Sequence, residues 1–399
     1  MEKHQTPRPL KSAIDHLSKF ADDGGADLIV PPGKWLTGSF NLTSHFTLYI
    51  HKDAIILGSL FWFFFLFFLS FFWQLHDESD YPIVKALPSY GGTAGRFSSL
   101  ILGTNLTDVV ITGNNSKAII HVCMGTSLYT MLASSASMVS SSGGNGTING
   151  QGPDNPTLID SPSWNVHPIY SRNVIIQGLT IIAPVTVPNT DGINPDSCTN
   201  IRVEDCYIVS GDDSIAVKSA LNENGVKCGM PTEGLIIRRL TCISPHSLER
   251  GGYVKDIYVR RMTMKTMRFA FWIIGDYGPP PAPGHEGPVI EGINYRDMVA
   301  DNVTYPAQLH GISGGPFTGF CISNVTIGLT EESRKQQWDC DEVQGITSRV
   351  TPQPCDLLSP SKEILNCPFP KDLLPIEDVK LRICSYCETT SGMVARTIH

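Results

Sequence analysis

The sequence predicts an all-β protein: a single-stranded right-handed parallel β-helix with a short capping helix at its N-terminus. Two observations lead to this fold. Helical periodicity is scarce after the first residues, and the chain then becomes short β-rich runs broken by Gly, Asn and Pro. Six of these runs share one nine-residue pattern, and a period of about 20 to 40 residues is typical of a solenoid.

The capping helix is expected at residues 12–21. Apolar residues recur there at helical spacing, at Ile14, Leu17 and Phe20. Gly24 and Gly25 follow and provide a C-terminal stop. A helix of this kind suits a cap over the first coil of a solenoid.

The repeats align without gaps. They are NVIIQGLTI from Asn173, NIRVEDCYI from Asn200, GLIIRRLTC from Gly234, DIYVRRMTM from Asp256, GINYRDMVA from Gly292 and GFCISNVTI from Gly319, with a weaker copy at Asp108–Ile111. Position one is Asn, Gly or Asp, positions two and four are apolar or aromatic, and position seven is apolar or Cys. No helix-length segment separates the runs, which favours a parallel β-helix whose coils stack at about 4.8 Å.

An antiparallel β-sandwich is the alternative, because it also has many short strands. It would need hairpin turns such as Asn-Gly between paired runs, and these are rare across residues 173–327. We therefore expect residues 1–399 to form a single β-helix domain, with a Cys-containing tail at residues 335–399.

A Phe-rich run interrupts this pattern. Leu60–Trp73 reads LFWFFFLFFLSFFW. A membrane span needs about 20 apolar residues, and one placed between two soluble strands would divide a domain. Because Phe, Leu, Ser and Trp codons can all begin with T, a translated T-rich tract is the other interpretation. We favour it and expect residues 60–75 to be a foreign insert, with no membrane partner.

Composition narrows the functional classes. With Lys+Arg 30, Asp+Glu 38 and a net charge of −8, the chain of 399 residues lacks the bulk basic footprint of a nucleic-acid-binding protein. Its 11 cysteines and six N-x-S/T sequons favour a secreted protein with disulfides. The first residues lack the apolar core of a signal peptide. Either the protein is cytosolic, or its true start lies upstream.

Acidic residues are concentrated in two neighbouring coils. PNTDGINPDSCTN carries Asp191 and Asp196, and VSGDDSIAVKS carries Asp212 and Asp213. One coil length separates Asp191 from the Asp pair, so these carboxylates should lie on adjacent rungs of one face. Like charges that close raise at least one pKa, which gives the acid and base of glycoside hydrolysis. Calcium binding and plain turns are the alternatives.

At these residues the sequence resembles a family. Asn189-Thr190-Asp191 followed by Gly211-Asp212-Asp213 is similar to the signature of the polygalacturonases, the pectin-degrading β-helix glycoside hydrolases. The stretch from SPSWNVHPIY to AVKS, together with RLTCISPHS, RGGYVKDIYV and GINYRDMVADNVT, resembles the plant branch. The resemblance covers most of residues 10–330.

The resemblance implies a role for each matching residue. Asp212 would protonate the leaving glycosidic oxygen, and Asp191 and Asp213 would activate the attacking water. Asn189 would orient Asp191 or touch a sugar hydroxyl. Lys218 would meet an acidic sugar, or be a solvated strand residue. Carboxylates and water suffice for this chemistry, so neither cofactor nor metal is expected, and the partner would be pectin or polygalacturonate bound by a monomer in the cell wall.

The chain also departs from the family pattern. The family's His near a Gly-Ser element and its substrate-binding Arg-x-Lys are missing where Ser247 is followed at once by Leu248. His246 is the candidate substitute for the family histidine. Each lost charge-assisted contact is worth about 1.5–3 kcal/mol. The sequence therefore predicts a polygalacturonase-like hydrolase of low activity or, alternatively, an inactive β-helix that binds cell-wall polysaccharide.

Overall fold

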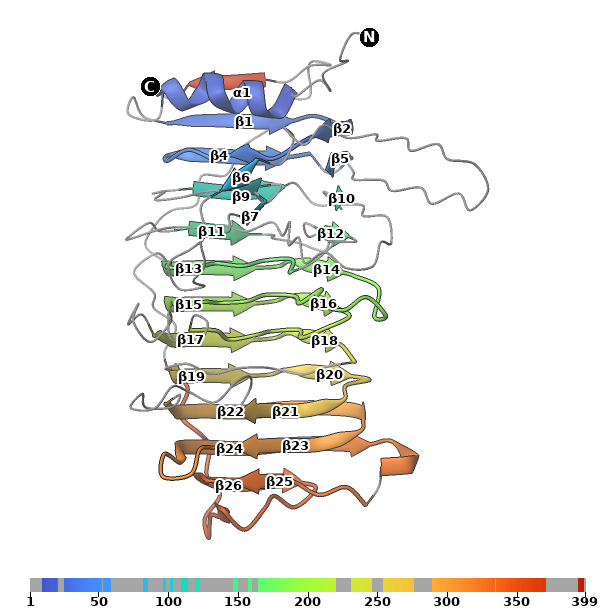
Figure 1. Ribbon diagram of the computed structural model, residues 1–399, viewed down its shortest axis with the longest axis vertical. Coiled ribbons are helices and arrows are strands. Elements are labelled where there is room, and N and C mark those ends of the chain that lie inside the picture. The colour runs from blue at the N-terminus through green and yellow to red at the C-terminus, as the bar shows by residue number, and fades with distance from the viewer. Residues whose placement is uncertain are drawn as a thin grey trace.

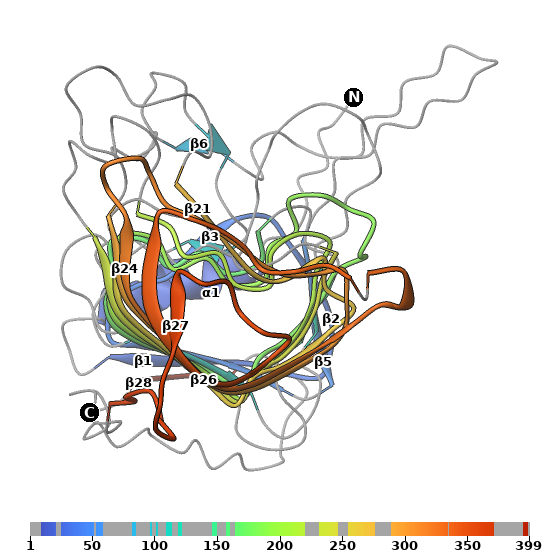
Figure 2. The ribbon, with the colours of Figure 1, turned by 90° about the horizontal axis from the view of Figure 1, so that it is seen from below.

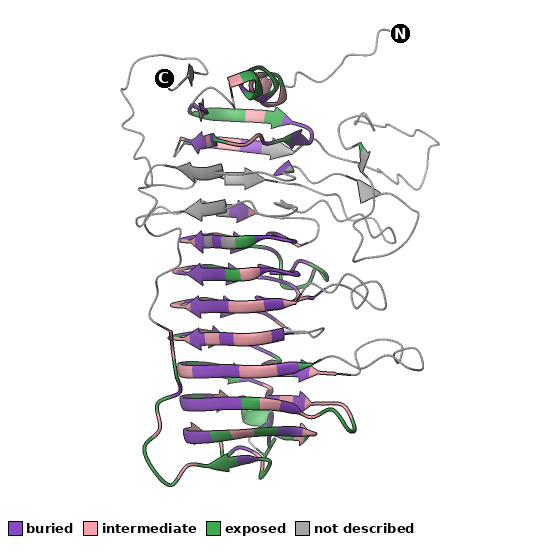
Figure 3. Cartoon of the chain, turned by 90° about the vertical axis from the view of Figure 1, so that its left-hand side faces the viewer, coloured by how far each residue is buried: buried purple, intermediate pink, exposed green. Residues whose placement is uncertain are grey.

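The computed structural model is a right-handed parallel β-helix whose coils stack along one long axis (Figure 1). Seen end-on, the coils lie over one another (Figure 2), and buried residues recur from coil to coil along the described stack (Figure 3), where they form one hydrophobic core. This confirms the predicted fold class. The structure describes residues 9–20, 25–51, 53–58, 82–84, 96–97, 101–102, 109–113, 119–121, 146–149, 157–159, 164–219, 231–245, 254–275, 289–333, 335–370 and 394–397.

Three faces build the described coils. Face A stacks β1 (Ala26–Val30), β4 (Phe46–Ile50), β9 (Val109–Gly113), β11 (Gly146–Asn149), β13 (Arg172–Gln177), β15 (Thr199–Glu204), β17 (Thr232–Arg238) and β19 (Val254–Arg260). Face B stacks β2 (Gly33–Thr37), β5 (Ala54–Gly58), β10 (Ile119–His121), β12 (Thr157–Ile159), β14 (Thr180–Ile182), β16 (Tyr207–Val209), β18 (Thr241–Ile243) and β20 (Thr263–Lys265). Long strands β22 (Ile290–Val303), β24 (Phe317–Leu329) and β26 (Val343–Thr351) continue both faces.

Face C is discontinuous. It comprises β3 (Phe40–Asn41) paired with β8 (Ile101–Leu102), isolated parallel bridges between residues 166 and 218, and the sheet of β21 (Phe269–Ile274), β23 (Tyr305–His310) and β25 (Asp339–Asp341). The other described elements are η1 (Ser18–Phe20), η4 (Glu331–Ser333), the antiparallel pair β6 (Ile83–Val84) and β7 (Arg96–Phe97), β27 (Leu358–Pro360) and β28 (Val394–Thr397).

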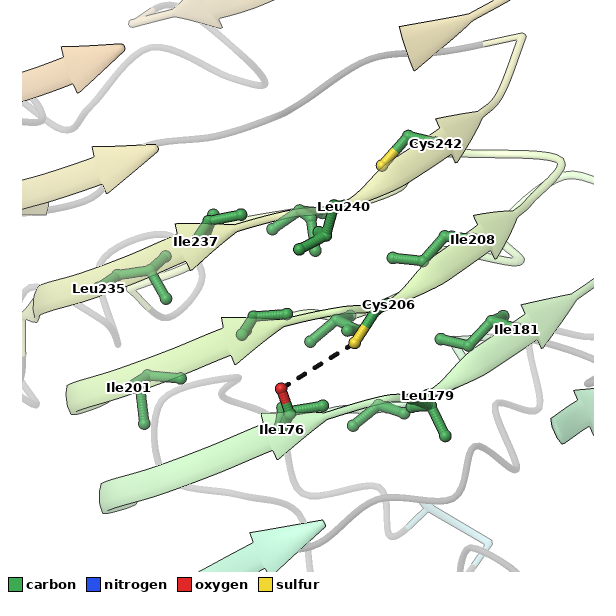
Figure 4. Close-up of a cluster of buried hydrophobic side chains, with 14 of the residues drawn as sticks. Ile176, Leu179, Ile181, Ile201, Cys206, Ile208, Leu235, Ile237, Leu240 and Cys242 are labelled. Carbon is green, nitrogen blue, oxygen red and sulfur yellow. Dashed lines mark hydrogen bonds between the residues drawn. The ribbon is translucent and has the colours of Figure 1, made fainter. Parts of the chain in front are cut away.

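The nine-residue repeat is the register of the stacked strands. Val174 pairs with Ile201, Ile201 with Leu235, and Leu235 with Ile257, all at position two. The buried side chains are Val174, Ile201, Leu235, Ile257, Ile293 and Phe320 at position two, Ile176, Val203, Ile237, Val259, Tyr295 and Ile322 at position four, and Leu179, Cys206, Leu240, Met262, Met298 and Val325 at position seven. Figure 4 shows part of these ladders. Each fully buried aliphatic chain contributes about 1.5–3 kcal/mol, so the repeat supplies the core.

The polar first position of the repeat has a backbone cause. This residue is left-handed in five of the six copies: Asn200 (φ 57°), Gly234 (67°), Asp256 (56°), Gly292 (71°) and Gly319 (72°). Glycine adopts this region freely, and Asn and Asp adopt it more readily than other residues with a Cβ. The Asn, Gly or Asp that opens each repeat therefore suits a bend near the start of each face A strand.

The N-terminal helix differs from the expected range. α1 spans Pro9–Leu17 and η1 continues to Phe20, so the α-helix begins and ends earlier than residues 12–21. Proline suits the first turn, where its missing N–H has no helical acceptor. The buried stripe is Leu10, Ile14 and Leu17, and Phe20 packs beside the core from the tighter turn. The helix covers the first coil, as expected.

The C-terminal segment follows the solenoid and then returns along it. Within residues 335–370, β25, β26 and β27 extend the stack. Two disulfides lie in the described part of the chain, Cys321–Cys367 and Cys340–Cys355. β28 then pairs antiparallel with β1, so the last described strand lies beside the first, at the α1 end (Figure 1).

One sequence interpretation falls on another part of the chain. The Phe-rich residues 60–75 lie outside the described residues. Among the described helices, none is long and apolar enough to cross a membrane.

Candidate active site

The acidic residues singled out in the sequence lie on face C, on neighbouring coils. Ile193 and Ile215 form a parallel bridge. Asp191 and Asp213 each precede these isoleucines by two residues, and the Gly192 N–H donates to the Asp213 carbonyl at 2.8 Å. The structure therefore brings Asp191 next to the Asp212-Asp213 pair, through the stacking of one coil on the next.

The three carboxylates differ in exposure. Asp191 is 4% exposed and Asp213 is 2% exposed, whereas Asp212 is only half-buried. Asp212 is thus the acid that solvent, or a glycosidic oxygen, reaches most readily. This division suits a site in which one acid meets a leaving group and two deeper acids hold a water molecule.

Asp191 has two strong partners. Its Oδ2 accepts hydrogen bonds from Asn194 Nδ2 at 2.8 Å and from Lys218 Nζ at 3.0 Å. The lysine contact is charge-assisted, and the two partners together fix the orientation of the carboxylate. A general base has to be held in place in this way.

Asp212 is held by the main chain. Its Oδ2 accepts the Asn189 N–H at 3.0 Å and its Oδ1 accepts the Asp213 N–H at 2.9 Å. Its carbonyl accepts hydroxyl hydrogen bonds from Ser210, at 2.8 Å, and from Ser244. Asn189 therefore fixes Asp212 through its backbone, while its exposed, left-handed position (φ 57°) leaves the side chain at the surface.

Lys218 faces the site. Its Nζ lies 3.5 Å from the centre of the Trp164 ring as well as 3.0 Å from Asp191 Oδ2, and its side chain is 11% exposed. A cation over an indole face is attracted by the ring quadrupole, more strongly where water is excluded. Of the two roles considered from sequence, a solvated strand residue does not match this environment.

Close backbone packing explains the glycine before the Asp pair. A Cβ on Gly211 would lie 2.0 Å from the Val187 carbonyl and 2.6 Å from that of Pro184. The Gly211 N–H donates to Thr190 Oγ1 at 2.8 Å, and this hydroxyl donates to the Val187 carbonyl at 2.9 Å. Thr190, in Asn-Thr-Asp, thus ties the two acidic segments together.

Sequence reasoning missed three residues that support the site: Trp164, Asn165 and Asn194. Asn165 Nδ2 donates to the carbonyls of Thr190 and Asp191 at 3.2 and 2.9 Å, so it holds the backbone of the base. Trp164 and Asn165 belong to SPSWNVHPIY. The signal available in the sequence was the polar side chain of Asn165, which lies one coil before Asp191.

Asp196 does not join the other acids. It is fully buried and lies 3.0 Å from His167 Nε2, and Ser197 Oγ donates to its second oxygen at 3.1 Å. Trp164 packs edge-on to His167 with ring centres 5.0 Å apart. This buried pair is structural support beneath the site.

His246, the predicted substitute for the family histidine, lies outside the described residues. The connection from β18 to β19 occupies residues 244–253, against 210–231 in the previous coil, yet β17 pairs with β19 and β18 with β20 without interruption. In the described part of the chain, no group of three or more His, Cys, Asp or Glu could hold a metal ion.

The chain resembles one known family and several known proteins. Residues 154–336 match Glycosyl hydrolases family 28. The chain is 49% identical to a probable polygalacturonase of Vitis vinifera over 95% of this chain and 83% of that protein. Their alignment runs over 454 positions, more than the 399 residues of this chain, so the relative holds internal residues that are missing here.

Solved structures show the same fold. The polygalacturonase from Erwinia carotovora has a TM-score of 0.60 at 17% identity, covering 92% of this chain and 95% of that one. The exopolygalacturonase from Thermotoga maritima has a TM-score of 0.55 at 21% identity, covering 84% and 86%. Both likenesses concern the coil architecture alone.

Proposed function

The chain belongs to the polygalacturonase family, glycosyl hydrolase family 28, and we propose that it hydrolyses the α-1,4-galacturonosyl bonds of pectin by single displacement. The observation that supports this most directly is the grouping of Asp191, Asp212 and Asp213 on adjacent coils, with Asp191 paired to Lys218 at 3.0 Å. A half-buried acid beside two buried ones provides the donor and acceptors of acid/base hydrolysis.

In this proposal each group has one task. Asp212 gives its proton to the glycosidic oxygen as the bond to the anomeric carbon breaks. A water molecule held by Asp191 and Asp213 attacks that carbon from the opposite side and loses its proton to them. The hydrogen bonds to Asp191 from Asn194 and Lys218 hold its carboxylate in place for that step.

Reducing ends released from polygalacturonic acid test the proposal. Asp212→Asn removes the proton donor, so release should fall at least about a hundredfold. Asp356→Asn is the matched control, because Asp356 is an exposed carboxylate on the loop before β27. Equal activity of the two variants and the parent would overturn the assignment.

A second candidate, an inactive β-helix that binds cell-wall polysaccharide, is favoured by one observation. The short connection of residues 244–253 contains no Arg-x-Lys, so the contact for a substrate carboxylate is missing from that coil. Affinity for oligogalacturonate without any product would support this candidate, whereas measurable turnover would exclude it.

We also propose that the protein acts outside the cell, as a monomer in the cell wall. The two disulfides of the C-terminal coils support an oxidising environment. Recovery of the protein from the apoplastic fluid with both bridges intact would be the expected result, and recovery only from the cytosol with free thiols would contradict it.

A further inference from the structure

Face C carries a second surface, formed by aromatic side chains of β21 and β23. Phe269 stacks on Trp272 with ring centres 5.7 Å apart and planes at 9°, and on Tyr305 at 4.9 Å and 24°. All three are partly exposed, whereas Phe271 in the same strand is fully buried. β21 thus directs Phe271 into the core and presents Phe269 and Trp272 outward, beside Tyr305 of β23.

Polar contacts fix this aromatic surface. Trp272 Nε1 donates to Gln308 Oε1 at 2.7 Å, and Gln308 Nε2 donates to Asp339 Oδ2 at 3.2 Å. His310 Nε2 lies 2.9 Å from the other oxygen of Asp339. These residues come from three successive coils, because Trp272 pairs in register with Gln308, and Gln308 with Asp339. The indole is therefore held in place, and the carboxylate beside it is already engaged.

A cation lies at the edge of the aromatic surface. The Arg268 guanidinium is 5.5 Å from the centre of the Phe269 ring, and the residue is exposed. Among the described residues Arg268 takes part in no ion pair. Arginine recognises carboxylates with its planar fork of donors, and the ring next to it keeps the fork oriented.

The surface lies on the same face as the acids. Face B strands β16, β18 and β20 follow one another in the stack, so the coil of β21 is the second after the coil of Lys218. At about 4.8 Å per coil the separation along the axis is about 10 Å. A polysaccharide chain lying along face C would therefore reach both places.

We propose that Arg268, Phe269, Trp272 and Tyr305 form a uronate-binding subsite for the same polysaccharide chain. The partly exposed rings pack against the apolar face of a sugar ring, and Arg268 binds its carboxylate. This inference rests on the proposed function for the identity of the polymer. In this subsite Arg268 supplies a positive charge for the carboxylate of an acidic sugar, at a different position in the sequence from the missing Arg-x-Lys.

Binding measured by calorimetry in the Asp212→Asn background tests this subsite without hydrolysis of the probe. The probes are oligogalacturonate and a neutral galacto-oligosaccharide of equal length. Arg268→Gln should weaken oligogalacturonate binding at least about tenfold, the loss of one charge-assisted contact, and leave the neutral probe unchanged. Trp272→Ala should weaken both probes. Arg261→Gln is the matched control, because Arg261 is an exposed arginine at the corner between β19 and β20.

The subsite is overturned if Arg268→Gln binds oligogalacturonate as tightly as Arg261→Gln, or if the parent binds no oligogalacturonate. Arg268 is exposed, so its variant is expected to keep the fold, and equal melting temperatures check this. Arg268-dependent binding without any turnover by the unmodified protein would support the subsite and contradict the proposed hydrolase activity. Turnover together with an affinity that does not depend on Arg268 would support the hydrolase activity and contradict the subsite.

Discussion

Lys218 Nζ lies 3.0 Å from Asp191 Oδ2, although the two residues belong to successive coils of the solenoid. Both side chains are almost fully buried, at 11% and 5% exposure. The lysine is also held over the Trp164 ring. An ion pair between coils makes the charge of the acidic site depend on how the coils stack, which links the register of the fold to the chemistry of face C.

Replacing this lysine separates the two roles considered for it. In Lys218→Met, Asp191 loses its charge-assisted partner, so kcat on polygalacturonate should fall about tenfold to a hundredfold, the effect of one such bond. If Lys218 positions Asp191, KM should stay near the parent value. If Lys218 binds the substrate carboxylate, KM should rise instead.

Lys218→Arg is the control for that experiment. It keeps the positive charge and the contact with an aromatic face, although the geometry of the guanidinium differs from that of an ammonium. We expect it to recover part of kcat. Loss in the arginine variant equal to that in the methionine variant would show that charge is not what Lys218 contributes.

Gly211→Ala should destabilise the site without touching a carboxylate. The added Cβ would lie 2.0 Å from the Val187 carbonyl, and backbone cannot move aside as a flexible side chain can. Overpacking of this kind costs about 1–3 kcal/mol of the free energy of unfolding, measured by urea denaturation. Gly315→Ala is the control, because only the Ile312 carbonyl lies within 4 Å, at 3.9 Å. A Gly211 variant as stable as this control would contradict the described packing.

The fold was predictable because its information is local and repeated. Positions two, four and seven of each repeat are buried, and an ungapped alignment of six stretches gave the strand register. Asn, Gly or Asp at position one also had a local cause, the left-handed backbone. Position six is left-handed as well. It is Gly, Asp or Asn in four copies but Arg239 (φ 57°) and Arg261 (φ 55°) in the other two, so its composition did not reveal that bend.

The candidate site was only partly predictable. Spacing placed Asp191 beside Asp212 and Asp213, since one coil length separates them. The hydrogen bonds that support them come from Asn165 and Asn194, and polar residues at turns are too common for sequence to distinguish support from solvation. The pairing of β28 with β1 joins the two ends of the chain, and no repeat pattern leads to it.

Alkaline pH should destabilise the protein through its buried thiols. Burial raises the pKa of Cys198, Cys206 and Cys242 from 9.0 to about 12. Between these values the thiols ionise in the unfolded chain but stay protonated in the folded one. The contribution of each thiol to the free energy of unfolding is therefore fully present below pH 9. It falls as the pH rises toward 12, by about 1.4 kcal/mol per pH unit for each thiol.

Urea denaturation between pH 8 and pH 10.5 measures this dependence. Cys206→Ala removes one of the three titrating thiols, so the free energy of unfolding should fall less steeply with pH than in the parent. This holds whatever the substitution does to stability at pH 8. Cys340→Ala/Cys355→Ala is the control for the slope, because a disulfide has no thiol to titrate in the parent. An unchanged slope in Cys206→Ala would contradict the burial of that thiol.

The Cys321–Cys367 disulfide should matter most at the C-terminal coils. It joins β24 to the returning segment across a sequence separation of 46 residues, and Cys367 also accepts a hydrogen bond from Arg296 and donates one to Ser323 Oγ. Phe369, two residues on, packs against Tyr258 and Arg260 on the outer side of face A.

Without the bridge, this segment can leave the outer surface of β19, β22 and β24. On the chain-entropy estimate, Cys321→Ala/Cys367→Ala should lose about 4 kcal/mol, against about 3 kcal/mol for removing Cys340–Cys355 with its separation of 15 residues. Thermal unfolding of the two double variants compares them, and limited proteolysis tests the location. Cleavage near residues 361–370 should accelerate only in the first variant, and equal protection in both would show that packing of Phe369 alone holds the segment.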